Sequence, residues 1–401
     1  MKTVQELKEN CCGCSACYSV CPQKAISMAE DEHGFCYPNI DETKCVDCGL
    51  CRKACQFSNT KQNSEDIQRF FAIKHKDRSI VRNSQSGGAF TLFSDWILEQ
   101  NGVVYGARLN TSSLTISHER AKSTKERDSL KASKYVQSTM NDIFASVAND
   151  LKAGRFVFFT GTPCQCDGLL SFLDLKRINR EEKLYTADLI CHGVPSQKMF
   201  KSFVAWNEKK YKSKVANFLF REKYKYPWGK HIEKISFENG RTIYTDWYAN
   251  IFYNDCSLRD SCFNCSYATS VRNTDITFAD FWGIGKCRPE MNDRFGCSSL
   301  IVHNLKGLDL LGKIRDNAIV SEVSKDDLVT PQPHLHGSAK KPDDYETFWK
   351  DYKELNFGQF LQKHSFNTVT FANALKTIFI RCAKFPFRVA RKLLRILHVL
   401  K

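Results

Sequence analysis

Short apolar runs alternate with helix-like segments through the middle of the chain. The runs have the length and the β-branched or aromatic content of buried strands, and apolar positions at helical spacing separate them. The strand-like runs are Phe70–Ile73, Gly102–Gly106, Arg155–Thr160 and Leu184–Ile190. The helical segments begin after Ser84, at Asn141/Asp142, at Cys166 and at Gln197. Strands that alternate with helices in this way predict an α/β domain.

A β-rich stretch follows from Val215. Phe218–Arg221 and the segment Ile232–Thr245 have strand patterns, and the Asn239-Gly240 pair is a strong hairpin turn signal. A later strand, helix and strand are predicted at Ser298–His303, Gly307–Arg315 and Ala318–Ser324. We therefore expect a β-rich lobe beside the α/β domain.

Two cysteine runs with the same spacing stand near the N-terminus. Cys11–Cys21 and Cys45–Cys55 each read C-x2-C-x2-C-x3-C, the spacing by which a loop wraps thiolates around one [4Fe-4S] cluster while its fourth cysteine reaches another. In that pattern one cluster takes Cys11, Cys14, Cys17 and Cys55, and the second takes Cys45, Cys48, Cys51 and Cys21. A zinc ribbon is the alternative, but it needs only four ligands in two pairs. The runs predict a small module like a bacterial two-cluster ferredoxin.

Three nearby residues do not fit the ligand frame. Cys12 and Cys36 lie outside it, and we expect them to be packing residues or spare thiols, because free cysteine is small and readily buried. Gln56 stands where the second run usually has proline, which affects the rigidity of the loop and not the ligation.

Length, charge and cysteine usage narrow the class of protein. A chain of 401 residues exceeds one ordinary core, so a cluster module with larger domains is expected. The net charge is +15, but residues 376–401 hold eight Lys or Arg and no acid. Aromatic residues are not interleaved with basic ones as in a nucleic-acid module, so we expect no nucleic-acid partner. Metal-type cysteine spacing without a signal peptide predicts a reducing, cytoplasmic location.

The C-terminal segment 384–401 has two faces if it is helical. Leu393, Leu394 and Leu397 share one face, while Arg388, Arg391 and Arg395 share another. This pattern predicts peripheral contact with anionic lipid at the inner face of the membrane, or docking of the helix on a protein surface. No run of about eighteen apolar residues is present, so no membrane span is expected.

Cysteines follow the two central strands. Cys164 lies in the turn Gly161–Gln165 and Cys191 in the turn Cys191–Ser196. Ligand sites of α/β sheets lie outside the carboxyl ends of strands, and a helix N-terminus favours a thiolate. Cys262 and Cys265 have the spacing of a metal-binding knuckle. These four thiols would suit a third cluster, with Cys256 as a substitute ligand.

A glycine loop and a histidine are further candidates. Gly87 and Gly88 precede a predicted helix, where backbone amides can approach a phosphate, although a tight turn into the helix explains them equally well. His192 follows Cys191 and is either near the reacting centre or a satisfied polar side chain. His334 and His336 lie in a predicted loop that contains Pro331 and Pro333, where solvated side chains are more usual than a metal site.

Six short motifs together resemble the beta subunit family of coenzyme F420 hydrogenase and dehydrogenase. They are SGG at Ser86–Gly88, SKYVQS at Ser133–Ser138, GTPCQ at Gly161–Gln165, CHGVPS at Cys191–Ser196, CFNC at Cys262–Cys265 and DFWG at Asp280–Gly283. With the cysteine runs, the resemblance covers roughly residues 1–320. Ala132 departs from the family pattern, in which glycine is expected before Ser-Lys-Tyr.

The resemblance implies FAD and one or more [4Fe-4S] clusters. It implies that the flavin is surrounded by Ser86, Gly87, Gly88, Ser133, Lys134, Tyr135, Gly161, Thr162 and Pro163. It also implies an inner cluster, for which we select Cys191, Cys262 and Cys265, and we expect Lys134, Cys164 and His192 near the reacting centre. The partner would be a redox carrier protein or the deazaflavin F420. Some bacterial members occur with genes for surface polysaccharide synthesis, so a small-molecule or glycan-related substrate is expected.

Four segments and one function follow as expectations. Residues 1–60 form the two-cluster module, 68–150 and 151–330 the two parts of an α/β flavin-binding domain with its β-rich lobe, and 331–401 a helical tail. The expected function is an iron–sulfur flavoprotein oxidoreductase that relays electrons between a one-electron carrier and a flavin. The alternatives are a non-catalytic electron-transfer subunit of a larger complex and a structural metal protein with a membrane-associating tail.

Overall fold

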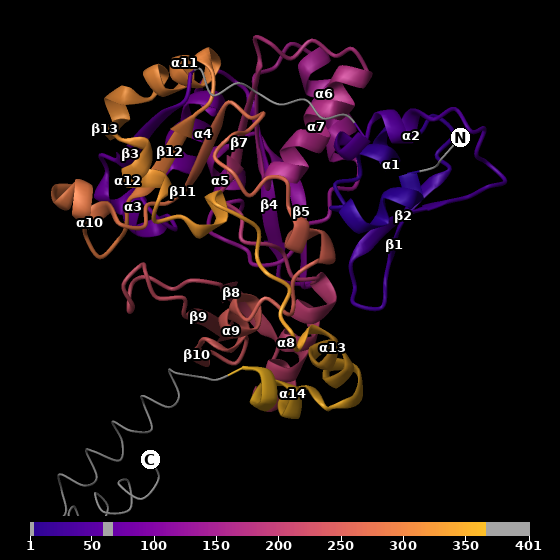
Figure 1. Cartoon of the computed structure of the whole chain (residues 1–401). Coiled ribbons are helices and arrows are strands. Elements are labelled where there is room, and N and C mark those ends of the chain that lie inside the picture. The colour runs from indigo at the N-terminus through magenta and orange to yellow at the C-terminus, as the bar shows by residue number, and fades with distance from the viewer. Residues whose placement is uncertain (1–3, 59–66, 366–401) are drawn as a thin grey trace, which may run out of the picture.

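The computed structural model describes residues 4–58 and 67–365, and Figure 1 shows their arrangement. The N-terminal module lies against helices α6 (Ile143–Lys152) and α7 (Pro163–Leu175). Its elements are η1 (Val4–Asn10), α1 (Ala16–Val20), β1 (Ile26–Glu30), β2 (Cys36–Ile40), α2 (Leu50–Lys53) and η2 (Gln56–Ser58). Strands β1 and β2 pair antiparallel and join the two cysteine-bearing loops.

An eight-stranded mixed sheet forms the centre of the larger part. Its order is β13-β3-β12-β11-β7-β6-β4-β5, and the pairs β4·β6, β6·β7 and β7·β11 are parallel. The strands are β3 (Arg69–His75), β4 (Val103–Asn110), β5 (Thr115–Ala121), β6 (Val157–Gly161), β7 (Leu184–Leu189), β11 (Ile276–Asp280), β12 (Ser298–Val302) and β13 (Ala318–Val323).

The central strands bury side chains on both of their faces, and helices therefore cover both faces of this sheet. In β6 every residue is buried, with Phe159 packed against α6 and α7 and Phe158 against α4 (Ala89–Glu99). Successive side chains of a strand point to opposite faces, so a continuous apolar run is what a strand between two helical layers needs. Helix α11 (Leu305–Lys313) packs on the same face as α4.

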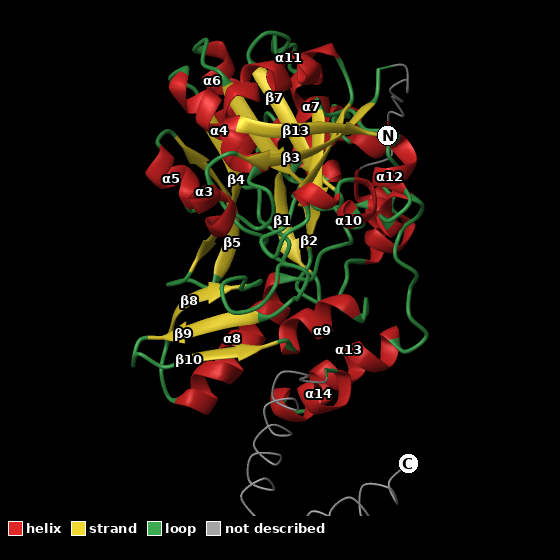
Figure 2. Cartoon of the chain, turned by 90° about the vertical axis from the view of Figure 1, so that its left-hand side faces the viewer, coloured by secondary structure: helices red, strands yellow, loops and turns green. Residues whose placement is uncertain are grey.

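The β-rich lobe is a second, smaller sheet of order β10-β9-β8, below the large sheet in Figure 2. Its strands are β8 (Val215–Leu219), β9 (Glu233–Phe237) and β10 (Thr242–Thr245). Its core is shared with helices α8 (Gln197–Tyr211), α9 (Trp247–Tyr253), α13 (Tyr345–Glu354) and α14 (Phe357–His364). The remaining elements are α3 (Arg78–Asn83), α5 (Thr124–Asp128), η3 (Asp260–Asn264), α10 (Ile284–Cys287), η4 (Pro289–Met291), η5 (Arg315–Asn317), α12 (Lys325–Val329) and η6 (Pro333–Leu335).

The predicted fold class is confirmed: a small ferredoxin-like module precedes a large α/β part with a β-rich lobe. One helix was not predicted and the start of another was wrong. The segment between β3 and the Ser86–Gly88 loop holds helix α3, because Asp77 caps it by accepting a hydrogen bond from Ser79 N at 2.7 Å. Helix α7 begins at Pro163 and not at Cys166, because Thr162 and Gln165 form a capping box.

One expectation falls on a part of the chain outside the described residues. It concerns the amphipathic segment 384–401. Within residues 4–58 and 67–365, none of the helices has the length and apolar character needed to cross a membrane.

Candidate functional site

Cysteines from both N-terminal runs meet in one group, which we call the first head group: Cys11, Cys14, Cys17 and Cys55. Cys14 and Cys17 are buried, and Cys11 and Cys55 are half-buried. Burial raises the pKa of Cys17, and the thiols of Cys14, Cys11 and Cys55 raise it further. Burial likewise raises the pKa of Cys55 to about 12, with Cys14 and Cys11 among the further causes. Cys55 therefore lies with the cysteines of the other run, as the ferredoxin pattern predicts.

The other four cysteines form the second head group, Cys21, Cys45, Cys48 and Cys51. They line a separate small cavity of the module. Cys45 and Cys48 are exposed, and between them Val46 is 62% exposed. Cys21 and Cys51 pack in one apolar cluster with Cys17 and Cys55, so the two head groups are neighbours. The second head group is thus more open to solvent than the first, in which Cys14 and Cys17 are buried.

The number of thiols in each head group suits a [4Fe-4S] cluster. A [4Fe-4S] cluster has four irons, each with its own thiolate, so its sulfur ligands stand further apart than those around one zinc ion. The donor set of four thiols in each head group fits such a cluster.

A third cysteine group, which we call the inner group, comprises Cys164, Cys191, Cys262 and Cys265. All four line one large cavity. Burial raises the pKa of Cys191, and the nearby thiols of Cys262, Cys164 and Cys265 contribute to that rise. Cys256 does not belong to this group, because its Sγ lies 3.3 Å from Asp344 Oδ1 in the core of the lobe. The prediction that Cys256 is a substitute ligand is therefore wrong, because Cys256 lies in the core of the lobe and not at the cavity.

Cys12 and Gln56 connect the first head group to the inner group. The amide of Gln56 donates to Cys12 Sγ at 3.3 Å and to Cys164 O at 3.0 Å, while Cys14 Sγ lies 3.6 Å from its Oε1. A hydrogen bond from Cys12 is the largest cause that lowers the pKa of Cys164 to about 7. Cys12 is thus more than a spare thiol, and proline at position 56 could not make these contacts.

Gly168 of α7 allows the module to sit this close. A Cβ at this position would lie 2.7 Å from Cys14 Sγ and 3.0 Å from Cys14 Cβ. Gly168→Ala is therefore expected to force the module away from α7 and to lower stability by roughly 1–3 kcal/mol, as overpacking does. The measurement is the midpoint of thermal unfolding together with retained iron. Gly312→Ala in α11 is the control, because a Cβ there meets nothing within 4 Å; equal losses in both variants would contradict this interpretation.

The large cavity measures about 1370 Å³ and lies beside the carboxyl ends of β6 and β7. Its lining includes Ser86 and Gly88, the segment Ser133–Ser138, and Gly161 and Thr162. Gly87 and Pro163 are not part of it. A Cβ on Gly87 would lie 2.3 Å from Ile73 O and 2.6 Å from Ser298 N. Glycine at this position therefore allows the loop to pack closely against the sheet.

Lys134 and His192 line the same cavity in different surroundings. Lys134 Nζ donates to the carbonyl oxygens of Leu130 and Lys131 at 2.8 and 2.6 Å, and burial lowers its pKa to about 7. His192 is linked to Asp255 through Nε2 and to His334 through Nδ1, both at 2.5 Å. The loop histidine His334 is therefore a partner of His192, and His336 instead bonds Val329 O at 3.0 Å.

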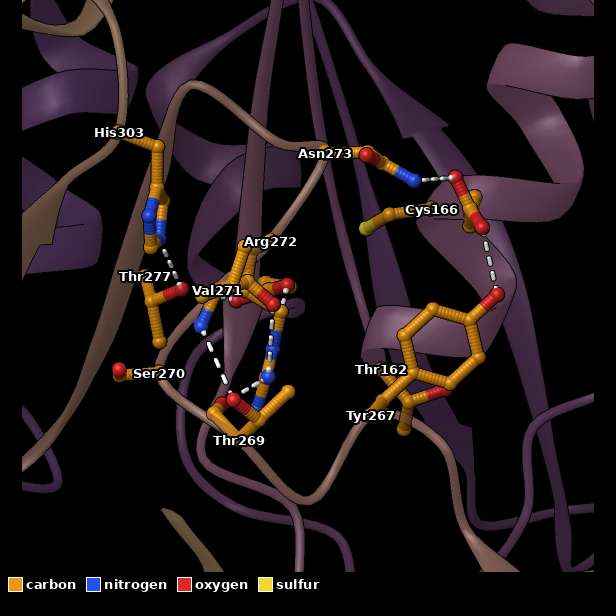
Figure 3. A network of polar contacts seen from close by, with 12 residues as sticks. Thr162, Cys166, Tyr267, Thr269, Ser270, Val271, Arg272, Asn273, Thr277 and His303 are labelled. Carbon is orange, nitrogen blue, oxygen red and sulfur yellow. Dashed lines mark hydrogen bonds and ion pairs between the residues drawn. The ribbon is translucent and has the colours of Figure 1, made fainter. Parts of the chain in front are cut away.

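A polar network includes several residues that line the cavity, and Figure 3 shows its hydrogen bonds. Arg272 lies 3.3 Å from the buried carboxylate of Asp188, and Thr277 joins that carboxylate to His303. Burial raises the pKa of Asp188 to about 6, although Arg272 opposes the rise. Next to this pair, Asp167 accepts from Tyr267 at 2.5 Å and from Asn273 at 2.7 Å. These bonds hold Arg272, Tyr267 and Asn273 in fixed positions at the cavity wall.

Sequence reasoning missed several cavity residues. Gln85, Arg221 and His231 line the cavity, and the buried atoms Gln85 Nε2, Arg221 Nε and His231 Nε2 have no hydrogen-bond partner among the described residues. Arg221 forms a buried ion pair with Asp280 of the DFWG motif. Arg259, three residues before Cys262, reaches the first head group. Only the Asp280 motif and the spacing to Cys262 could have drawn attention to these arginines.

Two family descriptions match the chain. Residues 154–327 match the family described as the C terminus of the coenzyme F420 hydrogenase/dehydrogenase beta subunit, and residues 10–59 match the 4Fe-4S dicluster domain. An uncharacterized ferredoxin of Methanocaldococcus jannaschii is 38% identical over 48 residues, which are 12% of this chain and 61% of that ferredoxin. A chain of the F420-reducing [NiFe] hydrogenase complex from Methanosarcina barkeri is similar in structure, with a TM-score of 0.48 and 16% identity over 74% of this chain and 97% of that chain.

Proposed function

The chain carries the C-terminal domain of the coenzyme F420 hydrogenase/dehydrogenase beta subunit family behind a 4Fe-4S dicluster domain, and we propose that it is an iron–sulfur flavoprotein oxidoreductase. It exchanges single electrons with an outside carrier at the second head group and connects them to FAD and a substrate in the large cavity. FAD supplies the change from one-electron to two-electron chemistry.

One observation carries this proposal: the cysteine groups follow one another from the surface to the cavity, linked by packing and by the side chain of Gln56. This succession begins at the exposed Cys45 and Cys48 and passes through the shared apolar cluster of Cys51, Cys17 and Cys55. It then continues by way of Cys14, Gln56 and Cys12 to Cys164 in the inner group. A protein with purely structural metal would need no such continuity between three cysteine groups.

The cavity fits a flavin dinucleotide in size and in donor set. Its volume exceeds that of the pockets that bind drug-sized ligands, which measure roughly 300–1000 Å³. The N-terminus of α7 and the buried donors of Gln85 and Arg221 stand at its wall, and such groups suit phosphate and carbonyl oxygens. Ser86, Gly88, Ser133, Lys134, Tyr135, Gly161 and Thr162 would hold the flavin, and the inner group would hold a third cluster.

The exposed second head group is suited to a redox partner. A carrier can approach Cys45 and Cys48 without any movement of the α/β part, because both thiols lie at the surface. A one-electron carrier at this face is a ferredoxin-like protein, whereas F420 transfers hydride and would exchange it with the flavin in the large cavity. This exposure also suits an electron-transfer subunit whose partner holds the active site, and flavin content separates the two functions.

The test is a cofactor count on protein purified without oxygen. About twelve iron atoms, matching sulfide and one FAD per chain are expected, since each [4Fe-4S] cluster has four irons. The double variant Cys262→Ala, Cys265→Ala is expected to keep about eight. Eight irons without flavin in the unmodified chain would favour the electron-transfer subunit, and zinc in place of iron would overturn the proposal.

A further inference from the structure

Arg259 is a buried cation between two cysteine groups. It is 1% exposed and lies three residues before Cys262 of the inner group. Its guanidinium points to the N-terminal module, where Nε donates to Cys11 O at 2.7 Å and Nη2 to Cys36 O at 2.9 Å. Nη2 also lies 3.8 Å from Cys11 Sγ, and the guanidinium stacks on the ring of Tyr37 at 4.1 Å. The side chain therefore bridges the α/β part and the first head group.

This guanidinium has no carboxylate partner among the residues of the described ranges. Three other buried arginines do: Arg127 pairs with Asp95 and Asp128, Arg221 with Asp280, and Arg272 with Asp188. Burying an unpaired charge is costly. The groups that face its guanidinium are instead the Cys11 sulfur, the Tyr37 ring and the oxygens of Cys11, Cys36 and Gln137.

We propose that Arg259 is the counter-ion of the cluster held by the first head group and raises the reduction potential of that cluster. The inference rests on the proposed function, because it requires a cluster at Cys11, Cys14, Cys17 and Cys55. A cluster with four cysteine thiolates carries net negative charge, and one-electron reduction adds another negative charge. Burial opposes that addition, whereas a cation near the sulfur favours it.

Hydrogen bonds of Gln137 fix the position of the Arg259 side chain. Gln137 accepts from Arg259 Nη1 at 3.0 Å and donates from its own Nε2 to Cys12 O at 2.7 Å. The guanidinium is thereby held at the side of the first head group that faces the inner group. Without this charge, the first cluster, which is the less exposed of the two, would be the harder to reduce, and electron transfer to it from the second head group would be less favourable.

The test is a redox titration of the head clusters followed by electron paramagnetic resonance. At a fixed potential, Arg259→Met is expected to lower the ratio of reduced to oxidised first cluster about tenfold, which is about 59 mV for a one-electron couple. Arg259→Lys keeps the charge and is expected to recover most of that shift. Cys48→Ala removes the second head cluster and so assigns the signal. Arg127→Met, which removes a buried arginine far from the cysteines, is expected to leave the potential unchanged.

Each outcome bears on the proposal. An unchanged potential in Arg259→Met with full iron overturns it, and so does a shift in Arg259→Lys as large as that in Arg259→Met. If Arg259→Met and Arg259→Gln lose the iron of the first head group while Arg259→Lys holds it, the charge is required and the proposal stands. Loss of iron in all three variants assigns Arg259 a packing role. Since the readout is a head cluster, it remains measurable even if the chain binds no flavin.

Discussion

Cys55→Ala is expected to remove about four iron atoms that belong to the cluster of the other cysteine run. The reason is positional: Cys55 lies with Cys11, Cys14 and Cys17, although it closes the run that begins at Cys45. A [4Fe-4S] cluster deprived of one of its four thiolates is expected to be lost or incomplete. Cys21→Ala is the matched variant and is expected to remove the second head cluster instead. Iron per chain and the number of paramagnetic head signals are the measurements.

Double variants distinguish the crossed arrangement from the uncrossed one. Residues that act in one unit give non-additive losses, whereas independent sites add. Cys14→Ala with Cys55→Ala is therefore expected to lose about four irons, and Cys48→Ala with Cys55→Ala about eight. The reverse result, with Cys48 and Cys55 non-additive, would mean that each run holds its own cluster and would contradict the crossed arrangement.

Lys134→Met is expected to slow reduction of the bound flavin by at least about 100-fold if Lys134 supplies a proton in that step. Burial lowers the pKa of Lys134 to about 7, so its amine exchanges a proton near neutral pH. Below that pH the group is a charged donor, and above it the group is neutral. The rate in the unmodified protein is therefore expected to fall as pH rises through about 7, and the rate in Lys134→Met to lack this step.

The measurement is the bleaching of flavin absorbance after mixing with a reduced viologen, over a range of pH. Lys134→Arg is the control, because its guanidinium stays charged throughout and cannot give the step near pH 7. Flavin and iron content must match the unmodified protein in both variants. A pH profile in Lys134→Met that retains the step would assign it to another group and remove the proton role of Lys134.

Stability provides a second readout for the same lysine. Its pKa in the folded protein lies below that of the unfolded chain, so the unfolded chain binds the proton more tightly between about pH 7 and pH 10. The free energy of unfolding therefore rises with pH across that window, and the penalty of the buried charge is fullest below pH 7. Removing the amine in Lys134→Met is expected to stabilise the fold most at the acidic side.

Local sequence patterns were sufficient to predict the main elements and the chemistry of the thiols. Apolar runs such as Val157–Gly161 must be buried on both faces, and this local pattern is enough to predict a strand between helices. The spacing of the two cysteine runs likewise predicted two four-thiol sites, because a short loop around a cluster leaves little freedom in spacing. Helix starts were less secure, since the capping box at Thr162 and the Asp77 cap depend on single side chains.

Only the packing of the whole chain shows which residues that are distant in sequence share a site. Cys256 lies close to Cys262 in sequence yet packs in the lobe, whereas Cys164 and Cys191 reach the cavity from two different strands. Gln56 looked like a mere replacement of proline, but the docking of the module on α7 brings it to Cys12 and Cys164. Arg259 carries no motif of its own. Its proposed role depends on its burial and on the lack of a carboxylate partner among the described residues. That burial requires contacts between segments more than 200 residues apart, and a local sequence pattern cannot predict such contacts.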